Sequence, residues 1–216
     1  MEKIKYTRFL LVKDNFYKSP EKVYQTALES DFYAPEHATG YRSKKVYHEI
    51  GIKEKLETIL GIHINRWDTD PLEENGVFYQ GFSEGKRKEI PGVHADEPYN
   101  DITVVVYLTP GLPYNCGTSL WQHKKSGLME PMKPKVKKGE TFNEDEFLYP
   151  FERDSKIRNR WEEIDRVGYR FNRMVAYPSG VFHSATNHYG HAGKNGRIYQ
   201  TFRIGVDWDS FKLRNV

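Results

Sequence analysis

A mainly β fold with flanking helices, a jelly roll or barrel, is predicted by three features of this sequence. Tyr and Phe are frequent, with 15 and 12 copies among 216 residues, and both favour strands. From residue 62 onward, short apolar runs alternate with Gly, Pro and Asn, as in antiparallel strands joined by turns. Before residue 62, the chain carries two helical segments. Helices followed by many short strands favour an α+β architecture over a repeated strand–helix–strand fold.

Residues 1–61 are predicted to form a helical support for the sheet. Tyr6–Val12 has the composition of a strand. A Ser-Pro-Glu start predicts a helix from Ser19 to about Ser30, because Ser caps helices and Pro suits their first position. A second helix is predicted over Ile52–Leu60, where the following Gly is a typical stop. The segment Phe32–Tyr41 between them is expected to be a loop.

Residues 62–206 are predicted to form the jelly-roll core. The run Ile102–Leu108 is almost entirely β-branched or aromatic, so we expect a central strand buried on both faces. A charged segment, 124–167, interrupts the pattern, and residues 142–167 have helical spacing in their second half. We interpret it as an insertion between strands. The expected strands are Val77–Gly81, Ile102–Leu108, Ser119–His123, Arg170–Tyr177 and Arg197–Val206.

Length and charge predict a single domain, 1–216, with a cytoplasmic location. The net charge of +3, from 33 basic and 30 acidic residues, is too balanced for a typical nucleic-acid-binding protein. No apolar run has the length of a membrane span, and the N-terminus lacks the apolar stretch of a secretory signal. One cysteine, Cys116, excludes an internal disulfide framework and a cysteine-rich zinc site. The expected partner is a small-molecule or peptide substrate, and oligomeric state cannot be predicted.

Two histidines and an aspartate form a candidate metal site. His94 and Asp96 lie two residues apart just before the apolar strand, so both side chains can point to one face. His183 follows a turn that contains Pro178 and Gly180. Two imidazoles and one carboxylate on one side of an ion are the ligand set of non-haem iron(II) oxygenases.

Arg197 is the candidate for binding a co-substrate. It opens the last long strand, fourteen residues after His183. A planar guanidinium can bind a carboxylate through two parallel hydrogen bonds, which suits the far carboxylate of 2-oxoglutarate. Arg203 is its rival, because residues six apart on a strand share a face. We expect only one of the two to reach the co-substrate, and Arg203 to make a structural ion pair.

The pattern of His94, Asp96, His183 and Arg197 resembles the 2-oxoglutarate/iron(II) dioxygenase superfamily, over roughly residues 79–204. Residues 171–185 look like those of a group of uncharacterised bacterial and phage members. The resemblance implies a double-stranded β-helix with the triad at the barrel mouth, Fe(II) as metal and 2-oxoglutarate as co-substrate. It also implies that Tyr107 touches the co-substrate. The segment 116–120 resembles the Gly-Gly-x-Leu turn of the superfamily, with Cys116 where Gly is more usual.

The predicted function is therefore oxygenation that depends on iron(II) and 2-oxoglutarate. Because Asp96 supplies a carboxylate where halogenases of the superfamily have Gly or Ala, hydroxylation is the expected outcome. A cupin-like metal-binding jelly roll without oxygenase activity is the alternative, and it would not need Arg197. A catalytically inactive interaction protein on the same scaffold is a further one.

The other histidines are given lesser roles. His188 and His191 lie in an Asn- and Gly-rich segment and are expected to be solvated. His123 is expected to be structural or to face the substrate.

Overall fold

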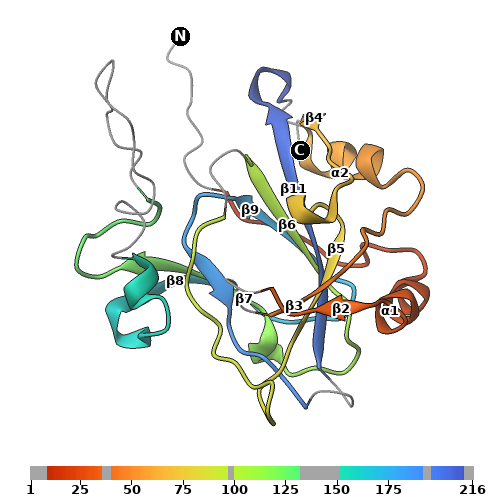
Figure 1. The fold of residues 1–216 in the computed structure, drawn as a ribbon. Coiled ribbons are helices and arrows are strands. Elements are labelled where there is room, and N and C mark those ends of the chain that lie inside the picture. Colours follow the sequence, from red (N-terminus) through yellow and green to blue (C-terminus); the bar gives the residue numbers. More distant parts are fainter. Residues whose placement is uncertain (1–8, 36–39, 97–99, 132–150, 192–195, 212–216) are drawn as a thin grey trace.

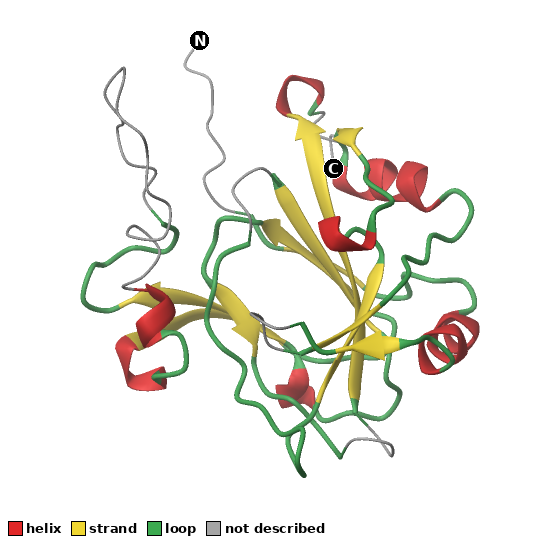
Figure 2. Cartoon of the chain, viewed as in Figure 1, coloured by secondary structure: helices red, strands yellow, loops and turns green. Residues whose placement is uncertain are grey.

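The chain was analysed as a computed structural model, which describes residues 9–35, 40–96, 100–131, 151–191 and 196–211. Antiparallel strands dominate it, and two helices flank them (Figures 1 and 2). The two flanking helices are α1, Pro20–Leu28, and α2, Ile52–Leu60. The strands are β1 Leu11–Lys13, β2 Phe32–Tyr33, β3 Tyr41–Ser43, β4 His63–Arg66, β5 Val77–Gly81, β6 Ile102–Tyr107, β7 Thr118–His123, β8 Trp161–Val167, β9 Met174–Pro178, β10 His183–Ala185 and β11 Arg197–Asp207.

Both predicted helices are confirmed. α1 begins after Ser19, whose backbone carbonyl accepts hydrogen bonds from the amides of Lys22 and Val23. α2 ends at Gly61, which takes the left-handed conformation with φ of 70°. In Figure 1, both helices lie on one side of the large sheet.

Two sheets form the body of the molecule. The large sheet has the order β1-β9-β6-β11-β5-β3-β2, with β4 added beside β11, and the small sheet has the order β10-β7-β8. His94 extends the small sheet beyond β10 by one residue pair, an isolated antiparallel bridge to His183. From β5 onward, the chain passes back and forth between the sheets, and its last strand, β11, lies between β5 and β6. This interleaved, antiparallel order is a jelly roll, so the predicted fold class is confirmed.

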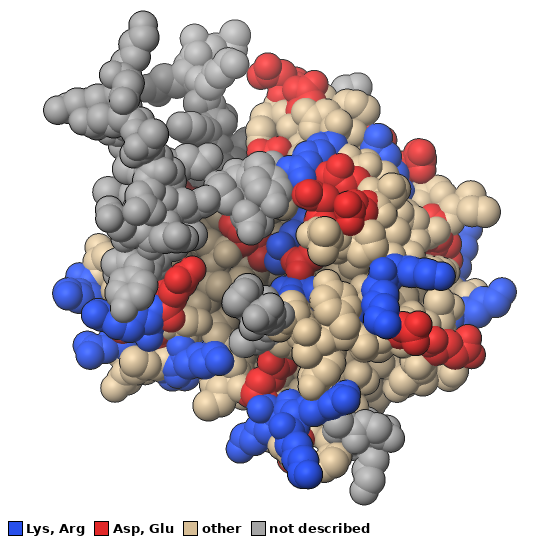
Figure 3. All heavy atoms as spheres, in the orientation of Figure 1, with Lys and Arg blue, Asp and Glu red and all other residues tan. Residues whose placement is uncertain are grey.

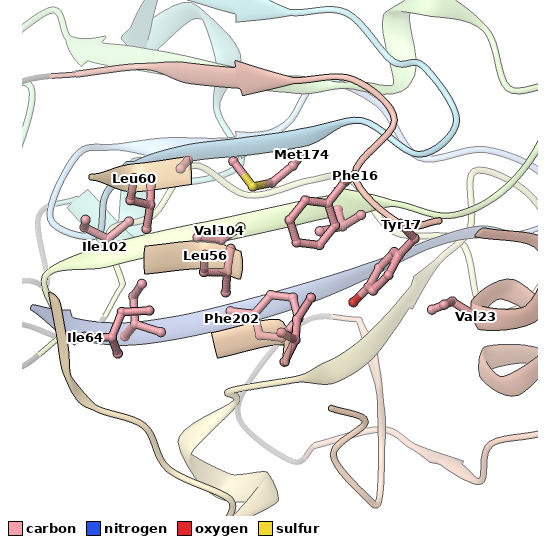
Figure 4. Packing of buried hydrophobic residues seen from close by; sticks show 14 of the residues in the cluster. Phe16, Tyr17, Val23, Leu56, Leu60, Ile64, Ile102, Val104, Met174 and Phe202 are labelled. Carbon is pink, nitrogen blue, oxygen red and sulfur yellow. The ribbon is translucent and has the colours of Figure 1, made fainter. Parts of the chain in front are cut away.

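The large sheet is buried on both faces. On one side, Val104 and Phe202 pack against Leu56 of α2 and against Phe16, which precedes α1 (Figure 4). On the other side, Val105, Tyr107, Val175 and Tyr177 pack towards Leu120 of the small sheet. Successive residues of β6 thus alternate between the two cores, which confirms the prediction of a central strand buried on both faces.

Four expectations need correction. The charged segment expected to have helical spacing ends in a strand, β8, which pairs with β7 along its whole length, so an insertion over 124–167 is wrong at its C-terminal end. The loop expected over 32–41 contains β2 and the start of β3. The strand expected from residue 170 begins only at Met174, because Asn172 turns the chain with φ of 62°. Of the first expected strand, residues 6–8 lie outside the described part, and β1 covers Leu11–Lys13.

Candidate metal and co-substrate site

His94, Asp96 and His183 converge, as the sequence predicted. One nitrogen or oxygen atom from each lies within 4.8 Å of the other two. The His183 Nε2 atom is 3.5 Å from Asp96 Oδ2, and the His94 Nε2 atom is 3.7 Å from Asp96 Oδ1. The group lines a cavity of about 500 Å³ between the two sheets. Its volume is within the range of small-molecule sites.

The backbone brings the two histidines together. The His94 amide donates to the His183 carbonyl at 3.0 Å, and the His183 amide donates to the His94 carbonyl at 2.8 Å. Such a pair places both side chains on the same face of the sheet. The two imidazole centroids are therefore only 4.4 Å apart.

Each imidazole is also fixed in one tautomer. The Nδ1 atom of His94 is 3.0 Å from the Gly92 carbonyl, and that of His183 is 2.8 Å from the Val181 carbonyl. A carbonyl oxygen can only accept, so both Nδ1 atoms carry the proton and both Nε2 atoms keep a free lone pair. Metal-binding histidines are commonly oriented by such a hydrogen bond from the second nitrogen.

Asp96 is buried among groups that keep it ionised. Its Oδ2 accepts from the Thr103 hydroxyl, and its Oδ1 accepts from Arg203 Nη2 at 2.8 Å. Burial alone would raise the pKa of Asp96, but the charge of Arg203 and the hydrogen bond from Thr103 hold it below its usual value. Burial lowers the pKa of His183 to about 4, so this imidazole is neutral near pH 7. A neutral imidazole and an ionised carboxylate are the forms that bind a metal.

The residues present therefore fit a divalent transition metal. Two imidazole nitrogens and one carboxylate oxygen form the donor set, and His94, with 53% of its side chain exposed, lies at the open side. Three protein ligands on one side of an ion leave the other side for further ligands.

Arg197 is buried in the same cavity. Arg197 is only 1% exposed. Its Nε donates to the Cys116 carbonyl at 2.7 Å, and its Nη2 donates to the Gly117 carbonyl at 3.3 Å. The guanidinium carbon lies 4.2 Å from the ring centre of Tyr199. Its Nη1 is buried without a hydrogen-bond partner among the described residues. An unpaired buried donor on a cation is costly, and a carboxylate would satisfy it.

Arg203 lines this cavity too, six residues further along β11 than Arg197. That only one of the two arginines reaches the co-substrate stays a prediction. Arg203 bonds to Asp96 and forms an ion pair with Glu74 at 2.5 Å. The predicted structural ion pair is thus confirmed. The buried negative charge of Asp96 helps to raise the pKa of Arg203 despite its burial.

Tyr107 lies beside Arg197 and deeper than the cavity wall. Its hydroxyl donates to Thr118 Oγ1 at 2.8 Å, its ring stacks on Tyr169, and the Arg197 guanidinium lies 5.5 Å from its centre. Thr118 and Tyr199 line the cavity at this point. The role of Tyr107 in touching the co-substrate stays a prediction.

Sequence reasoning missed His188, which was expected to be solvated. Its side chain is 8% exposed, and Nε2 lies 3.1 Å from Glu89 Oε1. The imidazole occupies the space that a side chain at Gly81 would fill. Gly81 itself is the signal that could have revealed it, because glycine in a strand often marks a close approach. Its neighbour His191 is exposed, as predicted.

His123 is structural, in agreement with the first of its two predicted roles. Its ring is buried between Trp161 and Phe151, and its nitrogens contact Asp154 and Ser126.

Comparisons with known proteins place this geometry in a family. A model described as "Family of unknown function (DUF6445)" matches residues 85–197, more than half of the chain. The chain belongs to this family. The part that matches the DUF6445 model contains all three residues of the candidate metal site and Arg197. A search of curated proteins found no match.

Two solved structures are similar to this DUF6445 chain. HygX from Streptomyces hygroscopicus, with nickel and 2-oxoglutarate bound, is 11% identical with a TM-score of 0.49, over 94% of this chain and 84% of that one. A prolyl-4-hydroxylase from Pseudomonas putida is 9% identical with a TM-score of 0.42, over 92% and 93% of the two chains. Within the described ranges, no helix is long and apolar enough to cross a membrane.

Proposed function

We propose that this protein is a non-haem iron(II)- and 2-oxoglutarate-dependent oxygenase that hydroxylates a small molecule or peptide. One observation carries the proposal: the unpartnered Nη1 of buried Arg197 lies in the same cavity as the His94, Asp96 and His183 group. A cupin-like metal site would use the three ligands but has no need for a buried guanidinium that lacks a carboxylate. An organic acid that binds the metal at one end and carries a carboxylate at the other would account for both the ligand group and the buried guanidinium.

His94 and His183 would hold the metal through Nε2, and Asp96 would hold it through a carboxylate oxygen. Bound Fe(II) and 2-oxoglutarate would together supply the oxygen-activating chemistry. Thr103 and Arg203 fix the Asp96 carboxylate through one hydrogen bond to each oxygen. This orients the only anionic ligand before the metal arrives.

Arg197 would bind the far carboxylate of 2-oxoglutarate. The carbonyls of Cys116 and Gly117 hold Nε and Nη2, which leaves Nη1 as the donor for the co-substrate. Tyr107 would support this site from behind the cavity wall, because it packs near the guanidinium and its hydroxyl bonds to Thr118, which lines the cavity. We propose that this support, with Thr118, is its part in co-substrate binding.

The remaining walls would exclude water and orient the substrate. Aromatic rings form much of them, including Tyr79 and Tyr199, which stack at 5.1 Å, and Phe182. Basic and acidic side chains are interspersed over the face seen in Figure 3. The one cysteine, Cys116, is a buried free thiol, in keeping with a reducing compartment, and we propose a single-domain cytoplasmic enzyme.

An anaerobic titration with Fe(II) and 2-oxoglutarate tests the proposal. A weak visible charge-transfer band is expected from the wild-type protein only when both are bound. Asp96→Ala should abolish metal binding. Arg197→Ala should retain the metal and bind 2-oxoglutarate about 10- to 100-fold more weakly, the loss of one charge-assisted contact.

Arg170→Ala is the matched control, because Arg170 is an exposed arginine whose partner Asp14 also has Arg173. It should leave both affinities unchanged. Metal binding without any response to 2-oxoglutarate in the wild-type protein would refute the oxygenase and favour the cupin-like alternative. Release of succinate during turnover would separate an active enzyme from an inactive relative.

A further inference from the structure

A histidine–glutamate pair that is mostly shielded from solvent lies at the Arg197 end of the barrel. The His188 Nε2 atom is 3.1 Å from Glu89 Oε1, and Glu89 Oε2 accepts a hydrogen bond from the Gly40 amide at 2.7 Å. The Glu89 side chain is 16% exposed and that of His188 is 8% exposed. A carboxylate can only accept, so Nε2 carries a proton and the imidazole is held in place from its outer side.

The other side of the imidazole lies next to Arg197. Gly81 on β5 is the cross-strand partner of Arg197 on β11. Both residues belong to the inward-facing set, because Tyr79 and Tyr199, two positions along each strand, line the cavity. A Cβ built on Gly81 would lie 2.4 Å from His188 Nδ1. The imidazole thus takes the place of the side chain that would face Arg197 across the strands, where Cβ atoms lie about 5 Å apart.

Two unsatisfied polar atoms lie on the residues of this region. Arg197 Nη1 and His188 Nδ1 are both buried with no hydrogen-bond partner within the described residues. Burying even one such atom is unfavourable, so two of them on residues that share Gly81 as a neighbour are consistent with one ligand that bonds to both. A carboxylate offers two acceptor oxygens and can bridge a guanidinium and a protonated imidazole.

We propose that His188, backed by Glu89, is a second anchor for the far carboxylate of 2-oxoglutarate, which it binds from Nδ1 while Arg197 binds it from Nη1. The inference rests on the proposed function and adds a residue that the triad-and-arginine pattern does not contain. Binding adds one proton, taken from solvent, to His188 at Nδ1, while Nε2 keeps its own proton and Glu89 remains a carboxylate. No bond to carbon changes in this step.

The charges that face His188 agree with proton uptake on binding. Burial lowers the pKa of free His188, Glu89 raises it, and the positive charges of Arg197 and Arg158 lower it. The imidazole is thus neutral near pH 7 without a ligand. An incoming carboxylate adds a negative charge beside Nδ1 and favours the protonated form.

Binding of two 2-oxo acids to the Fe(II)-loaded protein tests the proposal under anaerobic conditions. 2-Oxoglutarate carries the far carboxylate, and 2-oxobutyrate lacks it. His188→Ala should weaken 2-oxoglutarate about tenfold or more and change 2-oxobutyrate by less than about twofold. His191→Ala is the matched control: this exposed histidine of the same segment lies over Gly85 rather than Gly81, and its removal should change neither affinity.

A second variant displaces the imidazole without deleting it. Gly81→Ala puts a methyl group where Nδ1 now lies, so it should also weaken 2-oxoglutarate selectively. Calorimetry in buffers of different ionisation enthalpy should record uptake of about one proton per 2-oxoglutarate near pH 7.5 in the wild-type protein and none in His188→Ala.

The outcomes are distinct. Wild-type affinity for 2-oxoglutarate in a folded His188→Ala protein, with the same proton uptake, would overturn the second anchor and leave the proposed oxygenase standing. Equal weakening of both 2-oxo acids would also overturn it, because the effect would then come from the fold or the metal. Failure of the wild-type protein to bind either acid would refute the proposed function, and the anchor with it.

Discussion

Gly117→Ala should disturb two contacts: the close approach of residue 117, just before β7, to the end of β8, and the hydrogen bond from Arg197 to the Gly117 carbonyl. A Cβ at residue 117 would lie 1.9 Å from the Val167 carbonyl oxygen, about 1.5 Å short of the 3.4 Å at which ordinary contact begins. The carbonyl belongs to the backbone, and the position of a Cβ atom is fixed by the backbone, so rotation of a side chain cannot relieve this contact. Overpacking of this kind costs about 1–3 kcal/mol in the free energy of unfolding, or a Tm lower by about 3–10 °C at this chain length.

Thermal and urea unfolding of the metal-free protein measure this cost. Gly180→Ala is the control, because a Cβ there meets only Glu130 Oε2 at 3.5 Å. Gly117→Ala should also weaken 2-oxoglutarate binding, since the Gly117 carbonyl accepts from Arg197 Nη2. If its stability equalled that of Gly180→Ala, the close passage of the two backbones, and the reasoning built on it, would be refuted.

Two further predictions concern stability. Because burial lowers the pKa of His183 to about 4 from 6.5, the unfolded chain takes up a proton there as pH falls below about 6.5, whereas the folded metal-free protein resists until about pH 4. The free energy of unfolding should thus fall by roughly 1–3 kcal/mol across this window, at up to about 1.4 kcal/mol per pH unit, and urea titrations of His183→Asn should show a flatter decline. Trp161→Ala should lower the free energy of unfolding in urea by about 3–5 kcal/mol, because Trp161 on β8 is 2% exposed and packs on Phe182. Trp208→Ala is the control, and it should cost far less because Trp208 is 42% exposed. Equal costs would contradict the placement of β8.

The elements with strong local patterns were predictable from the sequence. α2 carries apolar residues at helical spacing and a glycine stop, and its predicted bounds, Ile52–Leu60, match the structure. β6 and β11 are long, β-branched and aromatic runs, and their predicted starts match as well. In these segments the local preference agrees with the final fold.

β8 was not predictable from composition, for a physical reason. It is the edge strand of the small sheet, and its sequence, WEEIDRV, contains four charged residues. Charges on an edge strand oppose pairing with other molecules, but they also hide the alternation that identifies a strand. Only Trp161 and Val167 at its two ends are buried. Such a segment also fits an exposed helix, so its composition alone predicts the wrong element.

In the site, spacing along the chain predicted which residues meet, but not how they are surrounded. The convergence of His94, Asp96 and His183 followed from a two-residue spacing and a turn before a strand. The burial of His188 depends instead on room left by Gly81, more than a hundred residues earlier. Arg203 reaches the cavity because β11 keeps one face inward along its length, so distance along the strand did not exclude it.

The direct backbone pairing of His94 with His183 has a consequence for how this site can vary. The spacing of two proposed ligands is set by main-chain hydrogen bonds, which do not depend on the side chains that line the cavity. Substitutions in the surrounding walls can therefore change the shape of the cavity for a new substrate, while the distance between the two imidazoles stays the same. Substrate selectivity and metal retention are thus separable properties in this scaffold, and each can be engineered without the other.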